Sequence, residues 1–156
     1  MGVLCVQQFE EQCAQLFQDI GESRVMVLAT SLHDHVTSRA ISVVVMEGKL
    51  YFQTDKTFRK YEQLINNPNV SLSFDQIQID GSCRELGSPN DHPMFCEMYR
   101  RHFAGSYGSY SMLANERLFE VTPRYIQRWL YEGTAPFVDS YDFINMRHVK
   151  KPYIGE

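Results

Sequence analysis

Apolar residues in the first segment of the chain recur at helical spacing and then give way to strand-like runs. The recurring positions lie three or four residues apart and precede Gly21: Phe9, Cys13, Leu16 and Ile20. This spacing predicts an amphipathic helix over residues 6–19. The next run, RVMVLATS at 24–31, is apolar and β-branched, so it predicts a strand buried on both faces.

Two further runs predict a β-hairpin. Residues 36–46 and 49–55 are rich in β-branched and aromatic side chains, and only Glu47 and Gly48 separate them. A two-residue turn that contains glycine is typical of such a hairpin, because glycine tolerates a positive φ. A second amphipathic helix is predicted after the hairpin, over residues 57–66, and it ends at the sequence NNP.

The remaining patterns predict more strands and one more helical stretch. Residues 69–86 alternate between polar and apolar side chains but shift phase by one near Gln76, which indicates a strand with a bulge or bend. A helical stretch around 95–99 follows, and residues 118–133 form a predicted strand with Pro123 at an edge or bulge. The tail has room for one more short strand. About six mostly sequential strands and three helices predict a mainly β fold, a six-stranded antiparallel barrel with peripheral helices, in one domain over 1–156.

Composition narrows the possible function classes. The 156 residues are 44% hydrophobic and 22% charged, with a net charge of −4 and a pI of about 5.7. An acidic chain argues against a nucleic-acid partner, and no apolar run approaches the roughly 20 residues of a membrane span. The N-terminus lacks the basic start and apolar stretch of a signal peptide. The four cysteines are scattered and form no C-x-x-C pair, which indicates reduced thiols and a cytoplasmic protein, with a structural disulfide as the alternative.

Cations gather where the hairpin meets the second helix. Counting outward from the Glu47–Gly48 turn places Arg39 opposite Lys56, and Arg59 and Lys60 fall in the first turn of the helix. Like charges across a strand pair cost some tenths of a kcal/mol, and a cation near a helix start costs roughly 0.3–1 kcal/mol. A phosphate bound there would remove these costs, so the four residues predict an anion site. Solvated cations at a frayed strand end are the alternative.

Small and polar side chains beside the cations could accommodate the molecule that carries the phosphate. The small residues alternate on one face of their strand: Ser38, Ala40 and Ser42. They would let a flat ligand lie against the backbone, across from the amide of Gln53. Gln76 and Gln78 lie at the phase shift of the later strand. They either point toward the same site or lie exposed on the solvated face of the sheet.

Residues 28–81 carry several short motifs in a defined order. They are LAT, an arginine before a β-branched run, YFQTD, an Arg-Lys pair, L-x-x-NP-x-V and DQIQIDG. Together these motifs resemble the pyridoxamine 5′-phosphate oxidase-like family of FMN-binding split barrels. A fainter likeness continues in EVTPRYIQRWLYEG near the C-terminus.

The resemblance implies a homodimer with FMN at the subunit interface and a small-molecule substrate. Arg39 and Lys60 would hold the FMN phosphate and Arg59 would assist, beside Lys56 of the predicted anion site. The other implied contacts lie along the flavin ring and its ribityl chain: Ala40, Ile41, Ser42, Gln53, Thr54, Gln76 and Trp129. A Trp129 that packs only in the core or in the dimer seam is the alternative.

Two departures from the family pattern concern the substrate. Val44 stands where oxidases of pyridoxamine phosphate have a lysine, and EGTAPFVDS lacks their Arg-x-His element. The chain is therefore expected to be an FMN-dependent oxidoreductase that passes electrons from a reduced nicotinamide to a small flat acceptor. It is similar to short bacterial members related to nitroimidazole reductases and is not expected to be a pyridoxamine phosphate oxidase. The alternatives are a non-catalytic flavin or haem sensor, a deazaflavin relative, and a small adaptor barrel for protein or RNA.

Histidines and tyrosines elsewhere carry weaker hypotheses. His33 and His35 form an H-x-H without a nearby third ligand, so no metal site is predicted. His92 or His102 could donate a proton to substrate or flavin, or could lie in surface loops. The Tyr-rich stretch 99–110 could line a substrate pocket or stack on a flavin, or could simply end a helix in a glycine-containing loop.

Overall fold

A computed structural model describes residues 2–155, with the side chains of Leu4 and Cys5 outside the described part. The helices are α1 (Gly2–Ile20), α2 (Arg59–Asn66), α3 (Pro93–His102) and α4 (Ala104–Ser106), with a 3-10 turn η1 (Pro89–Asp91) and a π-helical turn η2 (Tyr107–Ser111). The strands are β1 (Ser23–Leu32), β2 (His35–Met46), β3 (Lys49–Asp55), β4 (Asn69–Phe74), β5 (Ile77–Gly87), β6 (Glu116–Glu132), β7 (Ala135–Asp142) and β8 (Arg147–Pro152).

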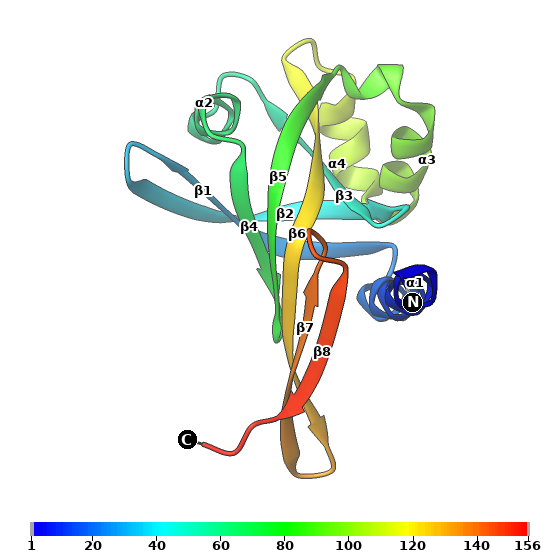
Figure 1. Cartoon of the computed structure of the whole chain (residues 1–156). Helices are drawn as coiled ribbons and strands as arrows, with labels where there is room; N and C mark the ends of the chain where they lie inside the picture. Colours follow the sequence, from blue (N-terminus) through cyan, green and yellow to red (C-terminus); the bar gives the residue numbers. More distant parts are fainter. Residues whose placement is uncertain (1, 156) are drawn as a thin grey trace.

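Six of the strands close into an antiparallel barrel. The strand order is β3-β2-β1-β4-β5-β6-β7-β8, and β3 also pairs with β6, which completes the ring. Strands β7 and β8 lie outside the barrel and continue the sheet along the far half of β6, as an extension that projects from the barrel (Figure 1). The predicted six-stranded barrel is therefore confirmed, although the tail adds two strands where the sequence indicated one.

The turns explain where the predicted strand boundaries hold and where they fail. Glu47 and Gly48 form the two-residue hairpin turn with φ of 50° and 75°, as expected. The prediction of one strand over 69–86 is wrong, because Asp75 takes a φ of 46° and the chain reverses there into the β4–β5 hairpin, with Phe74 paired to Ile77. The phase shift in the sequence marks this tight turn. The register of β5 against β6 shifts at two other places, between Asp80 and Gly81 and between Glu85 and Gly87.

The predicted burial of β1 on both faces is also wrong. Met26, Leu28 and Thr30 point into the barrel and are buried, whereas Val25 and Val27 of the other face are 60% and 44% exposed. An antiparallel barrel has one solvent-facing surface, so apolar side chains there have no cover within the chain. Buried and exposed residues therefore alternate along this strand. The sequence does not show the alternation, because both faces carry apolar residues.

The barrel interior is packed with aliphatic and aromatic side chains. Phe52 of β3 and Phe119 of β6 stack with ring centroids 5.5 Å apart across the seam that closes the ring. Outside the barrel, Phe95 and Tyr99 of α3 pack on Val44 and Leu118, so the helical segment α3–α4–η2 covers β3 and the start of β6 (Figure 1).

The extension is tied back to the N-terminal helix by buried charge. Arg128 of β6 donates hydrogen bonds to Asp139 of β7 at 2.7 Å and to Asp19 of α1 at 2.8 Å. Asp139 is 1% exposed and also accepts a hydrogen bond from Tyr141. A buried carboxylate with several partners holds its neighbours in one geometry, so the extension has a defined direction relative to the barrel.

Strands β2 and β3 separate soon after their hairpin turn. They pair only through three positions, from Met46 and Lys49 to Val44 and Tyr51. Beyond that point β2 continues its pairing with β1, while β3 turns to β6. The register predicted at the turn is correct, but the further pairing of Arg39 with Lys56 does not form because the strands have already diverged. The resulting gap gives the barrel its split.

Candidate functional site

Arg39 lies at the split end of the barrel and is held by neutral oxygens. It pairs with Leu28 of β1, and its Nη1 donates to the Leu28 carbonyl oxygen at 3.2 Å and to Thr30 Oγ1 at 2.7 Å. Its Nη2 donates to Thr37 Oγ1 at 2.5 Å and to Gln63 Oε1 at 3.4 Å. The guanidinium is therefore fixed in place by groups that leave its charge uncompensated.

Two more cations, Arg59 and Lys60, lie near Arg39. Burial and repulsion by Arg59 lower the pKa of Arg39, and burial and repulsion by Arg39 lower the pKa of Lys60. Within residues 2–155 none of the three forms an ion pair with a carboxylate within 4.0 Å. Lys56 is exposed on the turn before α2. The structure thus brings together three of the four predicted cations.

A cavity of about 370 Å³ lies next to Lys60, beneath the helical segment. Its lining comes from β3, α2, α3, α4, η2, the start of β6 and two adjoining turns: Gln53, Thr54, Asp55, Phe58, Lys60, Tyr99, Ser106, Tyr110, Leu113 and Glu116. The Gln53 amide oxygen accepts a hydrogen bond of 2.7 Å from Ser111, which orients the side chain. Aromatic walls with a few fixed polar groups are typical of small-molecule sites.

Thr54 has a buried hydroxyl without a partner. It is 3% exposed, and its Oγ1 is the buried side-chain polar atom left unsatisfied among the described residues. A buried hydroxyl without a hydrogen bond costs roughly 1–3 kcal/mol, so such atoms are rare unless a ligand or water completes them. The orphaned hydroxyl lies in the lining of the cavity beside Lys60. This is what a site for a polar ligand would show.

Glu116 is a further candidate residue of this site that no sequence pattern indicated. It is 5% exposed at the first position of β6 and lines the same cavity. Burial and the neighbouring Asp55 raise the pKa of Glu116 to about 7, against the opposing effects of Lys60 and Gln53. No motif marked it, since its importance arises from the pairing of Asp55 with Glu116 across β3 and β6.

The side chains that support Arg39 were missed as well. Thr30 donates to Gln63 Oε1 at 2.6 Å and Thr37 donates to the same atom at 2.8 Å. Gln63 is 3% exposed, which is unusual for a glutamine and is explained by this network. A polar residue on the inward face of the predicted helix over 57–66 was the available signal.

The row of small residues lies on the outer surface of the barrel. Ser38 and Ala40 are exposed and Ser42 is partly exposed, next to the uncovered Val25 and Val27 of β1. Ile41 points inward and is 9% exposed, so only its backbone is available to a ligand.

Gln76 and Trp129 lie together but belong to another part of the fold. The backbone N–H of Trp129 donates to the Gln76 carbonyl oxygen at 3.1 Å, where the β4–β5 turn meets β6. Figure 1 places α2 at one end of the barrel and this junction toward the extension at the other. The Trp129 ring contacts Tyr153, with centroids 5.0 Å apart. Within one chain, these two residues therefore do not join the cation cluster.

The remaining candidates separate clearly. His92 Nε2 is 2.9 Å from the Leu86 carbonyl oxygen and His102 Nε2 is 3.0 Å from Glu22 Oε2, and neither lines the cavity beside Lys60. Of the Tyr-rich stretch, Tyr99, Ser106 and Tyr110 do line it. No group of three or more potential ligand side chains within the described residues is arranged to hold a metal ion.

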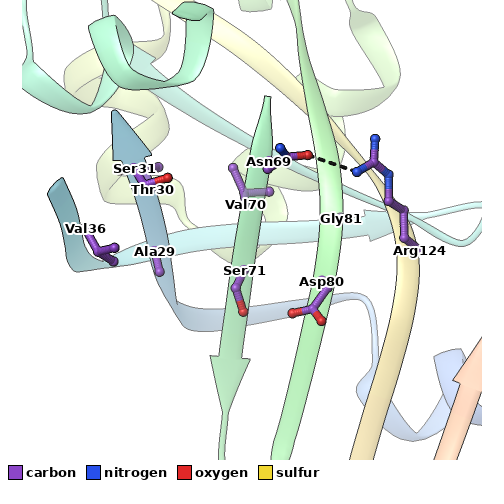
Figure 2. Close-up of a pocket in the computed structure, with 10 residues that line it drawn as sticks. All are labelled: Ala29, Thr30, Ser31, Val36, Asn69, Val70, Ser71, Asp80, Gly81 and Arg124. Atoms are coloured by element: carbon purple, nitrogen blue, oxygen red, sulfur yellow. Dashed lines mark hydrogen bonds between the residues drawn. The ribbon is translucent and has the colours of Figure 1, made fainter. Parts of the chain in front are cut away.

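A second hollow of about 380 Å³ lies on the outer surface of the sheet (Figure 2). Side chains of Ala29, Ser71 and Asp80 face it, and Arg124 at its edge donates a hydrogen bond of 2.9 Å to Asn69. Arg124 is the cation among the described lining residues and already donates to Asn69, so this hollow offers a weaker anion site than the cavity beside Lys60.

Fold and site together define a split β-barrel with a polar cavity that adjoins a cluster of three cations at Lys60. The sequence profile of the pyridoxamine 5′-phosphate oxidase family matches residues 9–130, so the chain belongs to this family. No curated protein matches the sequence. No helix among residues 2–155 is long and apolar enough to span a bilayer.

Solved structures with the same fold have low sequence identity. An FMN-binding, pyridoxamine 5′-phosphate oxidase-related protein of Nostoc punctiforme aligns with a TM-score of 0.60 and 12% identity over 96% of this chain and 94% of its own. A NimC/NimA family protein of Clostridium acetobutylicum aligns with a TM-score of 0.53 and 19% identity over 91% of this chain and 92% of its own. An F420 reductase aligns with a TM-score of 0.56 and 17% identity over 70% of this chain and 94% of its own. These likenesses support the split-barrel fold.

Proposed function

We propose that the protein binds FMN, with the phosphate at Arg39, Arg59 and Lys60. The observation that carries this proposal is a guanidinium fixed by neutral oxygens beside two further cations, with no carboxylate pairing any of them within residues 2–155. Three cations held together repel one another, and a phosphate is the ligand that turns this cost into charge-assisted hydrogen bonds. The orphaned Thr54 hydroxyl in the adjoining cavity supports a ligand that extends from this point.

The likeness to the FMN-binding protein of Nostoc punctiforme also favours FMN. A deazaflavin is the competing cofactor, because the F420 reductase has a similar fold. Bound FMN would supply reversible electron transfer, and the protein would supply binding, orientation and a shaped cavity.

We further propose a homodimer that completes the site. Val25, Val27 and Val36 are exposed on the outer surface of β1 and β2, at 60%, 44% and 71%, where a second copy could cover them. Gln76 and Trp129 are too far along the sheet to join the cation cluster of their own chain. In a symmetric dimer they would line the cavity of the partner subunit, where they could make the flavin contacts that the family resemblance implies.

The proposed activity is electron transfer from a reduced nicotinamide to a small flat acceptor. Tyr99, Tyr110 and Leu113 give the cavity the apolar and aromatic walls that a flat molecule would contact. Val44, where oxidases of pyridoxamine phosphate have lysine, is fully buried and offers no charge to a substrate phosphate. A cytoplasmic location is supported by the free thiols of Cys13, Cys83 and Cys96.

The first experiment is to purify the protein without added cofactor, record its visible spectrum and identify any released chromophore by mass. A yellow protein that releases about one FMN per chain supports the proposal. Release of a deazaflavin or of haem would replace the cofactor, and a colourless protein that does not take up FMN would overturn the assignment. Oxidation of NADH or NADPH by the loaded protein then separates an oxidoreductase from a non-catalytic flavin binder.

A further inference from the structure

Glu116 is a carboxyl group enclosed beside a proposed phosphate site. It lies at the start of β6, is 5% exposed and shares its cavity with Lys60. Attraction to Lys60 is present but outweighed by burial and by repulsion from Asp55, so the pKa of Glu116 rises to about 7. In this site an acid therefore changes charge near neutral pH.

Several groups around the cavity bear on this carboxyl, and Gln53 of β3 favours its charged form. Asp55 of β3 repels its charged form and Lys60 of α2 attracts it. Tyr99 of α3 and Tyr110 of η2 line the same cavity, and burial raises the pKa of Tyr99, so Tyr99 stays neutral. The neighbouring Arg117 pairs with another carboxylate, since its Nε lies 3.4 Å from Glu85 Oε1, and its Nη1 donates to the backbone oxygen of Glu116 at 2.8 Å.

A bound phosphate would change this balance in one direction. Lys60 is the cation that favours ionised Glu116. A dianion bound at Arg39 and Lys60 would compensate the charge of Lys60 and so weaken its attraction for the Glu116 carboxylate. The same dianion would add a new repulsion on a carboxylate in a partly enclosed cavity, where screening by water is weak. Both effects favour the neutral carboxylic acid, which can also donate a hydrogen bond.

We propose that Glu116 is protonated whenever the cavity holds the phosphate monoester of FMN, so that the cofactor binds together with one proton. Glu116 then couples the affinity for the cofactor to pH, and this role rests on the proposed function. It is absent from the residues that the family resemblance implies for FMN binding.

The coupling has a defined size. Above pH 7 most of the free protein must take up a proton before or during binding, so affinity falls as pH rises. With a pKa of about 7 in the free protein, the dissociation constant for FMN should rise about fifteenfold between pH 7 and pH 8.5. The phosphate of FMN does not contribute, since its second pKa is near 6 and it is already dianionic throughout this range.

The test is calorimetric titration of the apoprotein with FMN at pH 8 in two buffers with different ionisation enthalpies. The wild-type protein should take up about 0.9 proton per FMN bound, because that fraction of Glu116 is ionised beforehand. Glu116→Gln should take up almost none, and its affinity should be nearly constant from pH 7 to pH 8.5. The matched control is Glu62→Gln, an exposed carboxyl on α2, which should retain the uptake.

The outcomes separate this inference from the proposed function. Tight FMN binding by the wild-type protein without proton uptake would overturn the role of Glu116 and leave the cofactor assignment intact. Uptake that persists in Glu116→Gln would also overturn it, because a group other than Glu116 would then take up the proton. Absence of FMN binding by the wild-type protein would overturn both. The pH dependence of wild-type affinity tests the inference even if the variant does not fold.

Discussion

Arg39 Nη1 donates a 2.7 Å hydrogen bond to the hydroxyl of Thr30, so a cation next to two other cations is held by a neutral group. Thr37 and Gln63 hold the other nitrogen in the same way. A carboxylate in their place would position the guanidinium but would also neutralise it. Neutral partners position it and leave its field available, which prepares the site for an anion at little further ordering cost.

Removal of either principal cation should weaken FMN binding. Arg39→Ala and Lys60→Ala should each cost about 1.5–3 kcal/mol of binding free energy, which is the range of a hydrogen bond to a charged group. Quenching of flavin fluorescence on titration with apoprotein measures the loss. Arg124→Ala, which removes the cation of the second hollow, is the control and should bind FMN normally. Unchanged affinity in both cavity variants would refute the phosphate placement.

Thr54→Val should move stability and affinity in opposite directions. Valine has nearly the same shape, so the apoprotein loses a buried unsatisfied hydroxyl and should gain roughly 1 kcal/mol in free energy of unfolding. FMN affinity should fall because the ligand loses a hydrogen-bonding partner. Urea denaturation of the apoprotein and FMN titration give the two values. A loss of stability in the variant would indicate that the hydroxyl has a partner in solution.

The barrel could be predicted because its signals are local. The Glu47–Gly48 turn, the helix over 57–66 and the bulge at Pro123 each depend on a few neighbouring residues, and each is found. The pattern around Asp75 predicted a bulge or bend where the structure has a hairpin, since a two-residue turn and a one-residue phase slip change the polarity pattern in the same way. Only the positive φ of Asp75, which no sequence pattern displays, distinguishes them.

The candidate site was predicted in part for the same reason. Arg59 and Lys60 are neighbours in sequence, and a helix start carries both. The count from the turn paired Arg39 with Lys56, which does not occur, and Arg39 instead takes its place through its pairing with Leu28 of β1. Glu116 enters the site through pairing of β6 with β3, and such long-range pairing has no local signal. Lys56 was placed with the cations by extending a strand pair that ends after three positions.

A charge on the uncovered face of β1 should dissociate the proposed dimer. Val27→Glu would place two carboxylates in a symmetric apolar interface, which costs several kcal/mol when they are desolvated. Light scattering during size-exclusion chromatography should show a shift from dimer to monomer, with a loss of FMN in parallel. Val3→Glu, on an exposed position of α1, should remain dimeric. A Val27→Glu dimer that retains FMN would exclude this face as the interface.

Glu116 should make the apoprotein less stable as pH rises from about 4.5 to 7. Its pKa is raised in the folded state, so across this range the native protein binds more protons than the unfolded chain. Stability then falls with pH, by up to roughly 3 kcal/mol if the full shift is realised. Glu116→Gln should remove this slope. Urea denaturation at several pH values measures it, and parallel profiles for both proteins would contradict the assignment.

Gly81→Ala should destabilise the barrel. A Cβ at this position would lie 2.7 Å from Val121 Cγ1 and 2.9 Å from the backbone oxygen of Thr122, at the bulge opposite Pro123. Neither atom can move freely, so the expected cost is about 1–3 kcal/mol. Thermal unfolding followed by circular dichroism should show the loss, whereas Gly105→Ala, with open space around it, should not.

Strand β6 begins at Glu116 in the cavity and runs 17 residues, past Trp129 in the extension. In the proposed dimer one continuous strand therefore supplies residues to two different cofactors. A subunit with Arg39→Ala would lose its own site and still complete that of its neighbour, and a subunit with Trp129→Ala would do the reverse. A mixed dimer of these two variants should have one intact site and one site that lacks both residues. Two inactive variants should therefore complement each other, because β6 runs from one site to the other.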